Sequence, residues 1–130
     1  MTSGDDPSLG IAAFVSPHGF GHAARSSAVL AAAHRAAGTH AHVFTTAPPW
    51  FFEESLESFT YHPTIVDVGF RQTSALVFDT RKTVDALREL VPFDASAIQV
   101  LADEVLEAGC RVVLCDIAPM GVAVAEAAGL

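Results

Sequence analysis

The sequence predicts an α/β fold: a Rossmann-like open parallel sheet with helices on both faces. Short apolar segments of strand length alternate with helical segments of about ten or more residues, which is the pattern of βαβ units. The apolar segments are nearly continuous, as in strands that are buried on both faces. A glycine-rich turn follows the first strand, where open α/β sheets bind ligands. With right-handed crossovers, the expected strand order is 3-2-1-4.

The first predicted unit is a strand, a loop and a helix. Residues 1–10 form a polar leader that we expect to be disordered. Residues 11–16 are an apolar run of strand length. Residues 22–37 consist mostly of Ala, Leu and Arg, which favour a helix, and Gly38 follows where a helix typically ends. The domain is therefore expected to span residues 11–130.

A second strand, a short helix and a third strand follow. Residues 41–46 form the second strand. Two prolines then open a helix over residues 48–56, with acidic residues in its first turns. Residues 61–68 are rich in β-branched side chains and are predicted to be the third strand. Pro63 is typical of an edge strand, because it has no N–H to donate to a neighbour.

The next segment has a weaker pattern. Residues 69–93 are predicted to be a loop to about position 80 followed by a short helix, 84–91, which Pro92 ends. Asp94 is suited to cap a further helix over residues 94–108, in which apolar residues recur at helical spacing.

The last predicted elements are a fourth buried strand, 111–115, and a helix, 119–128. This strand would form an open parallel edge, so we expect that the domain is truncated before its last strands. Cys110 and Cys115 are the only cysteines. Their C-x4-C spacing matches neither a redox motif nor a zinc knuckle, and we expect two buried, reduced thiols.

Charge and composition exclude several classes of function. The net charge is −8 and the seven basic residues do not cluster, which disfavours nucleic acid and anionic lipid as partners. No uncharged apolar stretch reaches the roughly 18 residues of a transmembrane helix. The N-terminus does not resemble a secretory signal. With 51% hydrophobic residues and a mean hydropathy of +0.39, we expect a globular cytoplasmic protein.

The turn after the first strand, S-P-H-G-F-G-H-A-A-R at residues 16–25, carries the functional signal. Gly19 and Gly21 let the backbone turn sharply and approach a ligand, while free N–H groups at the start of the helix favour an anion or an electron-rich oxygen. With Ala24 they also satisfy the dinucleotide-binding pattern G-x-G-x-x-G/A. The acidic residue that should bind a ribose is missing from residues 44–47 (F-T-T-A), so an NAD(P)-binding domain is a minor alternative.

The segment F-V-S-P-H-G-F-G-H-A-A-R-S resembles the N-terminal domain of GT-B glycosyltransferases. The likeness is greatest to a bacterial glycosyltransferase-like group related to the N-terminal half of plant L-arabinokinase. V-D-V-G-F-R-Q at 66–72 and V-V-L-C-D-I-A-P at 112–119 match as well, so the resemblance covers nearly the whole chain.

This resemblance implies transfer of a sugar from a nucleotide-sugar donor to an acceptor hydroxyl, without a further cofactor. The acceptor would be a small molecule, a lipid or a carbohydrate. The chain would supply the acceptor-side half, and a C-terminal domain would bind the donor, so the chain alone is expected to be inactive. The alternative is a non-catalytic sugar- or nucleotide-binding module attached to a sugar kinase.

His22 and Asp116 are the predicted catalytic residues. His22 matches the histidine that contacts or deprotonates the acceptor in several GT-B enzymes, and its ordinary pKa near neutrality suits a general base. Asp116 follows the strand expected beside the first strand, so its carboxylate should face His22, although it could equally be a cap or turn residue. The predicted substrate-binding residues are His18, Gly19, Phe20, Gly21, Arg25, Ser26 and Gln72. No metal site is expected, because His18 and His22 have no evident third ligand.

The remaining aromatic and histidine residues are assigned to the core and the surface. Trp50, Phe51 and Phe52 are expected to be core residues rather than a sugar-stacking platform, because three consecutive aromatics cannot all face one cleft. The histidines predicted to lie at the surface are His34, His40, His42 and His62.

Overall fold

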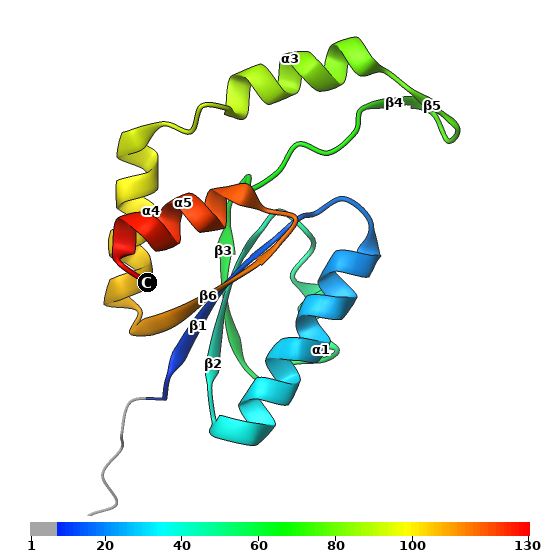
Figure 1. Ribbon diagram of the computed structural model, residues 1–130. Helices are drawn as coiled ribbons and strands as arrows, with labels where there is room; N and C mark the ends of the chain where they lie inside the picture. The colour runs from blue at the N-terminus through cyan, green and yellow to red at the C-terminus, as the bar shows by residue number, and fades with distance from the viewer. Residues whose placement is uncertain (1–7) are drawn as a thin grey trace, which may run out of the picture.

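The computed structural model describes residues 8–130, which form a four-stranded parallel sheet with helices on both faces (Figure 1). The elements are β1 (Gly10–Val15), α1 (Phe20–Ala37), β2 (His40–Thr45), α2 (Trp50–Glu53), β3 (Phe59–Pro63), β4 (Gln72–Ser74), β5 (Val77–Phe78), α3 (Thr80–Leu90), α4 (Ala95–Glu107), β6 (Cys110–Asp116) and α5 (Pro119–Ala128). The sheet order is β3-β2-β1-β6, which confirms the predicted order 3-2-1-4. Most of the predicted leader, residues 1–7, lies outside the described residues.

The core has two layers, one on each face of the sheet, and β1 contributes to both. Ala12 and Phe14 pack with α4 and α5 on one face, and Ile11, Ala13 and Val15 pack with α1 on the other. Successive side chains of a strand point to opposite faces, so a central strand must be apolar throughout. All six residues of β1 are buried, as this requires.

Glycine, proline and aspartate residues mark the helix boundaries. Gly38 ends α1 in the left-handed conformation, with a φ of 65°, and Pro119 is the first residue of α5. The side chain of Asp94 accepts a hydrogen bond of 2.8 Å from the backbone N–H of Ala97, which confirms it as the cap of α4.

The segment between β3 and α4 departs from the prediction in three places. β3 ends at Pro63 instead of continuing to position 68, because its partner β2 ends at Thr45; the N–H of Thr64 donates to the carbonyl of Thr45 at 3.1 Å. Its place at the edge of the sheet is confirmed. The predicted loop contains a short hairpin, β4–β5, which is too short to show an alternating pattern. α3 begins at Thr80 because Asp79 caps it through the N–H of Lys82.

The hairpin and α3, residues 70–91, form what we call the arm, which projects from the body of the molecule (Figure 1). Residues 70–78 are exposed, and Thr83 is the only residue of α3 that is buried. Two hydrogen bonds hold the arm together. The N–H of Arg71 donates to Thr83 Oγ1 at 2.9 Å, and the N–H of Asp79 donates to the carbonyl of Arg71 at 2.8 Å.

The two cysteines differ in exposure, which corrects the prediction that both are buried. Cys110 is buried and Cys115 is exposed. Cys115 lies on β6, which within residues 8–130 has a neighbouring strand on one side only. Over the same residues, no helix has both the length and the apolar character needed to cross a membrane.

Candidate functional site

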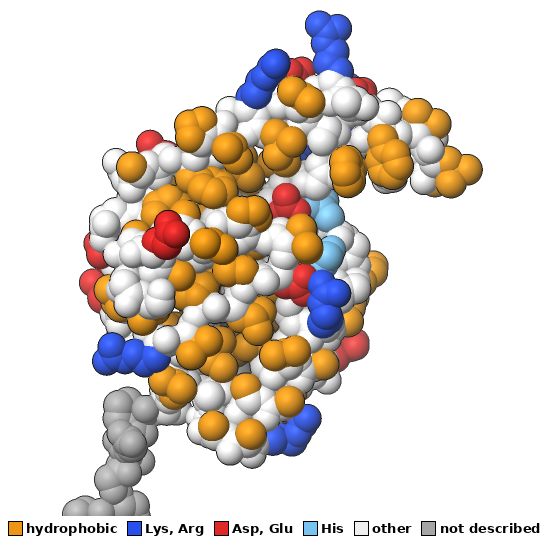
Figure 2. All heavy atoms as spheres, viewed as in Figure 1, with side chains coloured by type: hydrophobic (Ala, Val, Ile, Leu, Met, Phe, Trp, Pro, Cys, Tyr) orange, Lys and Arg blue, Asp and Glu red, His pale blue; other side chains and the backbone are white. Residues whose placement is uncertain are grey.

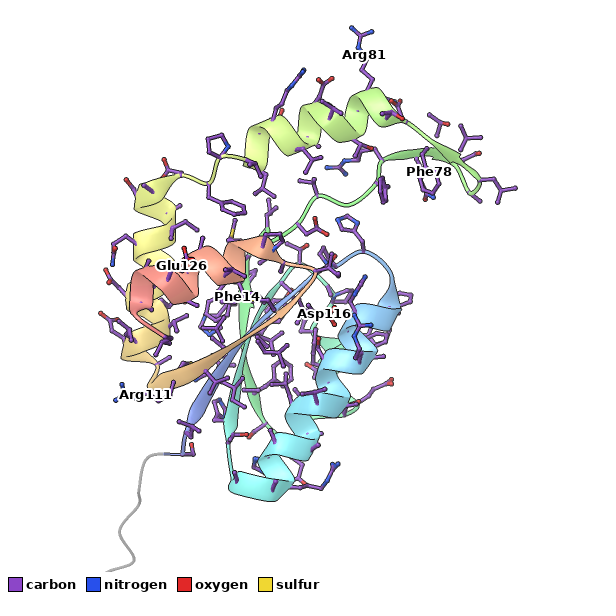
Figure 3. The ribbon with its side chains drawn as sticks, in the orientation of Figure 1. Phe14, Phe78, Arg81, Arg111, Asp116 and Glu126 are labelled. Carbon is purple, nitrogen blue, oxygen red and sulfur yellow. The ribbon has the colours of Figure 1, made fainter. Side chains whose placement is uncertain are left out.

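Two adjacent parallel strands, β1 and β6, position His22 and Asp116. Val15 and Asp116 are partners in the register of β1 and β6, so both strands end at the same level. The loop after β1 leads into α1, whose first turn carries His22. His22 Nδ1 lies 3.0 Å from Asp116 Oδ1, so the contact expected from the sequence is present. Figure 3 shows Asp116 beside the start of α1.

Asp116 is a buried carboxylate with several donors around it. Arg25 Nε donates to Oδ2 at 3.1 Å, a second guanidinium nitrogen of Arg25 contacts Oδ1, and Ser26 Oγ donates to Oδ2 at 3.0 Å. Burial alone would raise the pKa of Asp116, but the hydrogen bonds from Arg25, His22 and Ser26 together lower it below its ordinary value. Asp116 is therefore ionised at neutral pH.

The ionised carboxylate fixes the tautomer of His22. A carboxylate only accepts hydrogen bonds, so His22 Nδ1 carries the hydrogen and donates it to Asp116. A guanidinium nitrogen of Arg25 lies 3.2 Å from the same Nδ1. With hydrogen on Nδ1, both nitrogens are donors, so this contact is not a hydrogen bond. Nε2 is left as the nitrogen with a free lone pair, which makes His22 a possible proton acceptor.

His22 lines a cleft between the body and the arm, with a volume of about 360 Å³. This volume is within the range of small-molecule sites, roughly 300–1,000 Å³. The polar side chains of the cleft come mainly from the body: Ser16, His18, His22 and Asp67. Both parts supply apolar side chains, Val68 and Ile117 from the body and Phe70 and Leu87 from the arm. The cleft lies at the carboxyl ends of the strands, the usual ligand position in open α/β sheets.

Asp67 and Ser16 belong to this cleft and were not among the predicted site residues. Ser16 Oγ donates to Asp67 Oδ2 at 2.7 Å, which ties the end of β1 to the loop after β3. Asp67 Oδ1 accepts from the backbone N–H groups of Val68 at 2.8 Å and Gly69 at 3.3 Å. Asp67 lies in the segment 66–72 that matches the resemblance, but it falls inside the predicted third strand, 61–68, whereas β3 ends at Pro63.

Two backbone positions at the cleft have a positive φ. Gly69 has a φ of 57°, and a Cβ there would lie 2.3 Å from the ring of His18, so only glycine fits. Ile117, directly after Asp116, has a φ of 49° although it is β-branched and 62% exposed. Such a conformation costs about 1–3 kcal/mol and is concentrated at functional sites.

The other predicted substrate-binding residues divide into three groups. Arg25 and Ser26 contact Asp116, and the remaining loop residues surround the start of α1, with Gly19 at a φ of 80° and Phe20 61% exposed. Gln72 lies apart from them. It is an exposed residue of β4, paired with Phe78 on the arm, and is not part of the cleft wall.

The three consecutive aromatic residues are only partly in the core. Phe52 is buried, as expected, but Trp50 is 49% exposed. Phe51 is half-buried and stacks on Phe20 with ring centroids 5.1 Å apart. A four-residue helix turns consecutive side chains to different sides, so Phe52 alone is fully buried, Phe51 packs against the edge of the core and Trp50 is exposed.

Three histidines that were predicted to lie at the surface form a half-buried cluster, which corrects that prediction. His62 Nδ1 lies 2.7 Å from Glu104 Oε1 of α4, and His62 Nε2 lies 3.2 Å from His42 Nδ1. The ring of His40 lies 5.0 Å from that of His42. Burial and the neighbouring histidines lower the pKa of His42, although Glu104 opposes them. His34 is exposed, as predicted.

Within residues 8–130, no group of three or more His, Cys, Asp or Glu side chains is arranged to hold a metal ion. Comparison of the chain with protein-family models, with curated proteins and with solved structures finds no match. The features of this chain that bear on function are therefore the geometry of the cleft and the motif of the loop after β1.

Proposed function

We propose that this chain is the acceptor-side half of a glycosyltransferase that uses a nucleotide-sugar donor, with His22 as the general base. The observation that carries the proposal is the pair formed by His22 Nδ1 and Asp116 Oδ1, 3.0 Å apart, at a cleft of about 360 Å³. The pair leaves His22 Nε2 as the acceptor for a proton. The G-F-G-H turn, which resembles that of GT-B enzymes, supports the same role.

In the proposed reaction, the acceptor hydroxyl oxygen attacks the anomeric carbon of the donor. The bond from that carbon to the phosphate oxygen breaks, and its electron pair leaves with the nucleoside diphosphate. His22 Nε2 takes the proton of the hydroxyl. A base of this kind contributes roughly 10²- to 10⁴-fold to the rate.

Asp116 and Arg25 act through His22 in this proposal. The carboxylate of Asp116 holds the imidazole in the tautomer with hydrogen on Nδ1, and it stabilises the imidazolium that forms when Nε2 is protonated. Arg25 keeps Asp116 ionised, because its guanidinium contacts both carboxylate oxygens. Donor binding is assigned to a C-terminal domain, so the 130 residues alone are expected to bind nucleotide sugars weakly and to show no turnover.

The test is release of nucleoside diphosphate by the natural polypeptide that contains these residues. UDP-, GDP- and dTDP-sugars are supplied with a panel of sugar, lipid and aryl alcohol acceptors. His22→Ala is expected to lower turnover by roughly 10²- to 10⁴-fold, with donor affinity nearly unchanged. The matched control is His34→Ala, an exposed histidine at the other end of α1, which should leave turnover unchanged.

Three results would count against the proposal. Absence of release by the wild-type protein with every donor would favour a non-catalytic binding module. Equal turnover in His22→Ala and wild type would show that His22 is not the general base. A loss confined to donor affinity would make His22 a residue that binds the donor phosphates.

A further inference from the structure

A second cavity lies on the arm, next to the cleft. It has a volume of about 430 Å³ and is formed between the β4–β5 hairpin and α3. Phe70, Thr83 and Leu87 line both this cavity and the cleft that contains His22. The two spaces therefore adjoin each other across these three side chains. The cleft carries the polar groups Ser16, His18, His22 and Asp67, and the second cavity is enclosed by the arm.

The cavity on the arm is apolar. Its wall consists of phenylalanine, valine, leucine and threonine residues, without a charged side chain. Phe70 and Phe78 are 75% and 58% exposed, and their rings are tilted with centroids 5.4 Å apart. Figure 2 shows hydrophobic side chains along the side of the arm that faces the body, opposite histidine and carboxylate side chains. An aromatic ligand would bury these rings without removing a charge from water.

The amphipathic pattern of α3 also indicates that this cavity binds an apolar group. Val84 and Leu87 face the cavity, whereas Arg81 points away from it (Figure 3). An amphipathic helix normally buries its apolar stripe against the core. Here that stripe is exposed, with Val84 at 38% and Leu87 at 42%. The stripe lies in the wall of a ligand-sized space that adjoins the cleft of the candidate base.

We propose that the arm binds an aromatic group of the acceptor, so that the acceptor is an amphiphilic molecule with a hydroxyl at His22 and an aryl group among Phe70, Phe78, Val84 and Leu87. The position of the hydroxyl rests on the proposed function. The position of the aryl group rests on the three side chains that the two cavities share and on the apolar side chains that line the second one. Phenylalanine rings in tilted arrangement favour a further aromatic ring, since edge-to-face and offset contacts add to area burial.

The test compares two soluble probes in the absence of a donor: 2-naphthyl β-D-glucoside and methyl β-D-glucoside, measured by isothermal titration calorimetry. The naphthyl compound is expected to bind at least about tenfold more tightly, because only it fills the apolar cavity. Phe78→Ala and Leu87→Ala should each weaken its binding by roughly 5- to 10-fold. Both side chains are largely exposed, so these variants should fold, and thermal melting checks this.

Two matched controls lie on the same arm. Leu76→Ala removes an apolar side chain that is 90% exposed and is not in the cavity wall, and Arg81→Ala removes a side chain that points away. Neither should change binding of the naphthyl compound. Equal affinity for the two glucosides, or equal losses in Leu76→Ala and Phe78→Ala, would overturn the proposal. So would light scattering that shows a dimer of the wild type converted to a monomer by Phe78→Ala.

The outcome separates this inference from the proposed function. Selective naphthyl binding without turnover in the donor assay would retain the aryl site and reject the transferase. Turnover without any preference for aryl acceptors would retain the transferase and reject the aryl site. His22→Ala should leave naphthyl binding within about twofold, since the apolar end supplies most of the affinity.

Discussion

The chain contains two histidine–carboxylate pairs of similar geometry in different surroundings. His22 Nδ1 lies 3.0 Å from Asp116 Oδ1 at the carboxyl end of the sheet, and His62 Nδ1 lies 2.7 Å from Glu104 Oε1 between β3 and α4. The other nitrogen of His62 is taken by His42 at 3.2 Å, and His62 stacks on Phe44 with centroids 4.2 Å apart. His22 instead lines a cleft.

This difference shows that a short histidine–carboxylate contact does not identify a reactive site by itself. For proton transfer the second ring nitrogen must face a space that a substrate can enter. His22 meets this requirement, whereas both nitrogens of His62 have partners from the protein. We therefore assign the first pair to chemistry and the second to the attachment of α4 to the sheet. The following four predictions test that assignment, from the largest expected effect to the smallest.

Replacing the carboxylates of Asp116 and Glu104 by amides should have different effects on turnover. Asp116→Asn should lower turnover by roughly 10²- to 10⁴-fold, because the amide does not stabilise the imidazolium of His22. It should also lower the free energy of unfolding by about 1–3 kcal/mol, because donors around position 116 lose a charged acceptor. Glu104→Gln should leave turnover unchanged, since its amide oxygen can still accept from His62. Steady-state kinetics and chemical denaturation measure both effects. Similar turnover in the two variants would contradict the assignment.

Replacing His62, the histidine of the second pair, should affect stability but not turnover. His62→Ala loses the contacts with Glu104 and His42 and the stack on Phe44, so the free energy of unfolding should fall by about 1–3 kcal/mol. His62→Phe keeps the stack and should recover part of this loss. Turnover at saturating substrates should match wild type in both. A fall in turnover without a fall in melting temperature would show that His62 takes part in the reaction.

The two clusters should respond to acid in different pH ranges. The pKa of His42 lies below its ordinary value of 6.5, through burial and the neighbouring His40 and His62, although Glu104 opposes the shift. The unfolded chain therefore binds a proton at this position first as the pH falls, and stability present above pH 6.5 decreases below it. The pKa of Asp116 lies below 3.8, so its stabilising ionised form is present above that pH and is lost only at lower pH.

Melting temperatures measured by calorimetry from pH 8 to pH 3 should show both decreases. His42→Phe should remove the decrease that begins near pH 6.5, and Asp116→Asn should reduce the one below pH 3.8. Persistence of the upper decrease in His42→Phe would mean that another group causes it. Persistence of the lower decrease in Asp116→Asn would show that the Asp116 network does not control acid stability.

A change beside the cleft should affect acceptor binding with little effect on either histidine pair. In Gly69→Ala the new Cβ would lie 2.3 Å from the ring of His18, and alanine is disfavoured at a φ of 57°. The loop must move, so the acceptor KM should rise by roughly 3- to 10-fold, the equivalent of about 1 kcal/mol of strain. Gly38→Ala is a suitable control, with a φ of 65° and no atom near the added Cβ. Equal KM values for the wild type and the Gly69 variant would show that acceptors do not contact this loop.

The sheet could be predicted from the sequence because its central strand β1 is buried on both faces and its neighbours also carry apolar residues. A short, continuous apolar run such as β1 fits a central buried strand and few other structures. Prolines or glycines mark the ends of the neighbouring helices. The arm could not be predicted in the same way. Its hairpin strands have three and two residues, too few for a period of two to be recognised, and their side chains are exposed. Local hydrogen bonds that Asp79 accepts from the N–H of Lys82, and Thr83 from the N–H of Arg71, stabilise its shape.

The site was predictable where it depended on strand order. Once β1 and β6 were expected to be neighbours, the contact between His22 and Asp116 followed from the end points of the strands. Gln72 shows the limit of motif matching, because the residue matches the resemblance but lies in the exposed hairpin. The histidine cluster depends on the position of α4 over β2 and β3, a contact between segments far apart in the sequence. Periodicity along the chain does not reveal such a contact.

The hydrogen bond from Ser16 to Asp67 has a mechanical consequence. It fastens the loop after β3 to the end of β1 immediately before the arm begins, and at the other end of the arm Leu90 and Phe93 pack against the core. The arm is therefore attached to the body on both sides. The width of the cleft depends on these two attachments, and neither of them includes the first turn of α1, which carries His22.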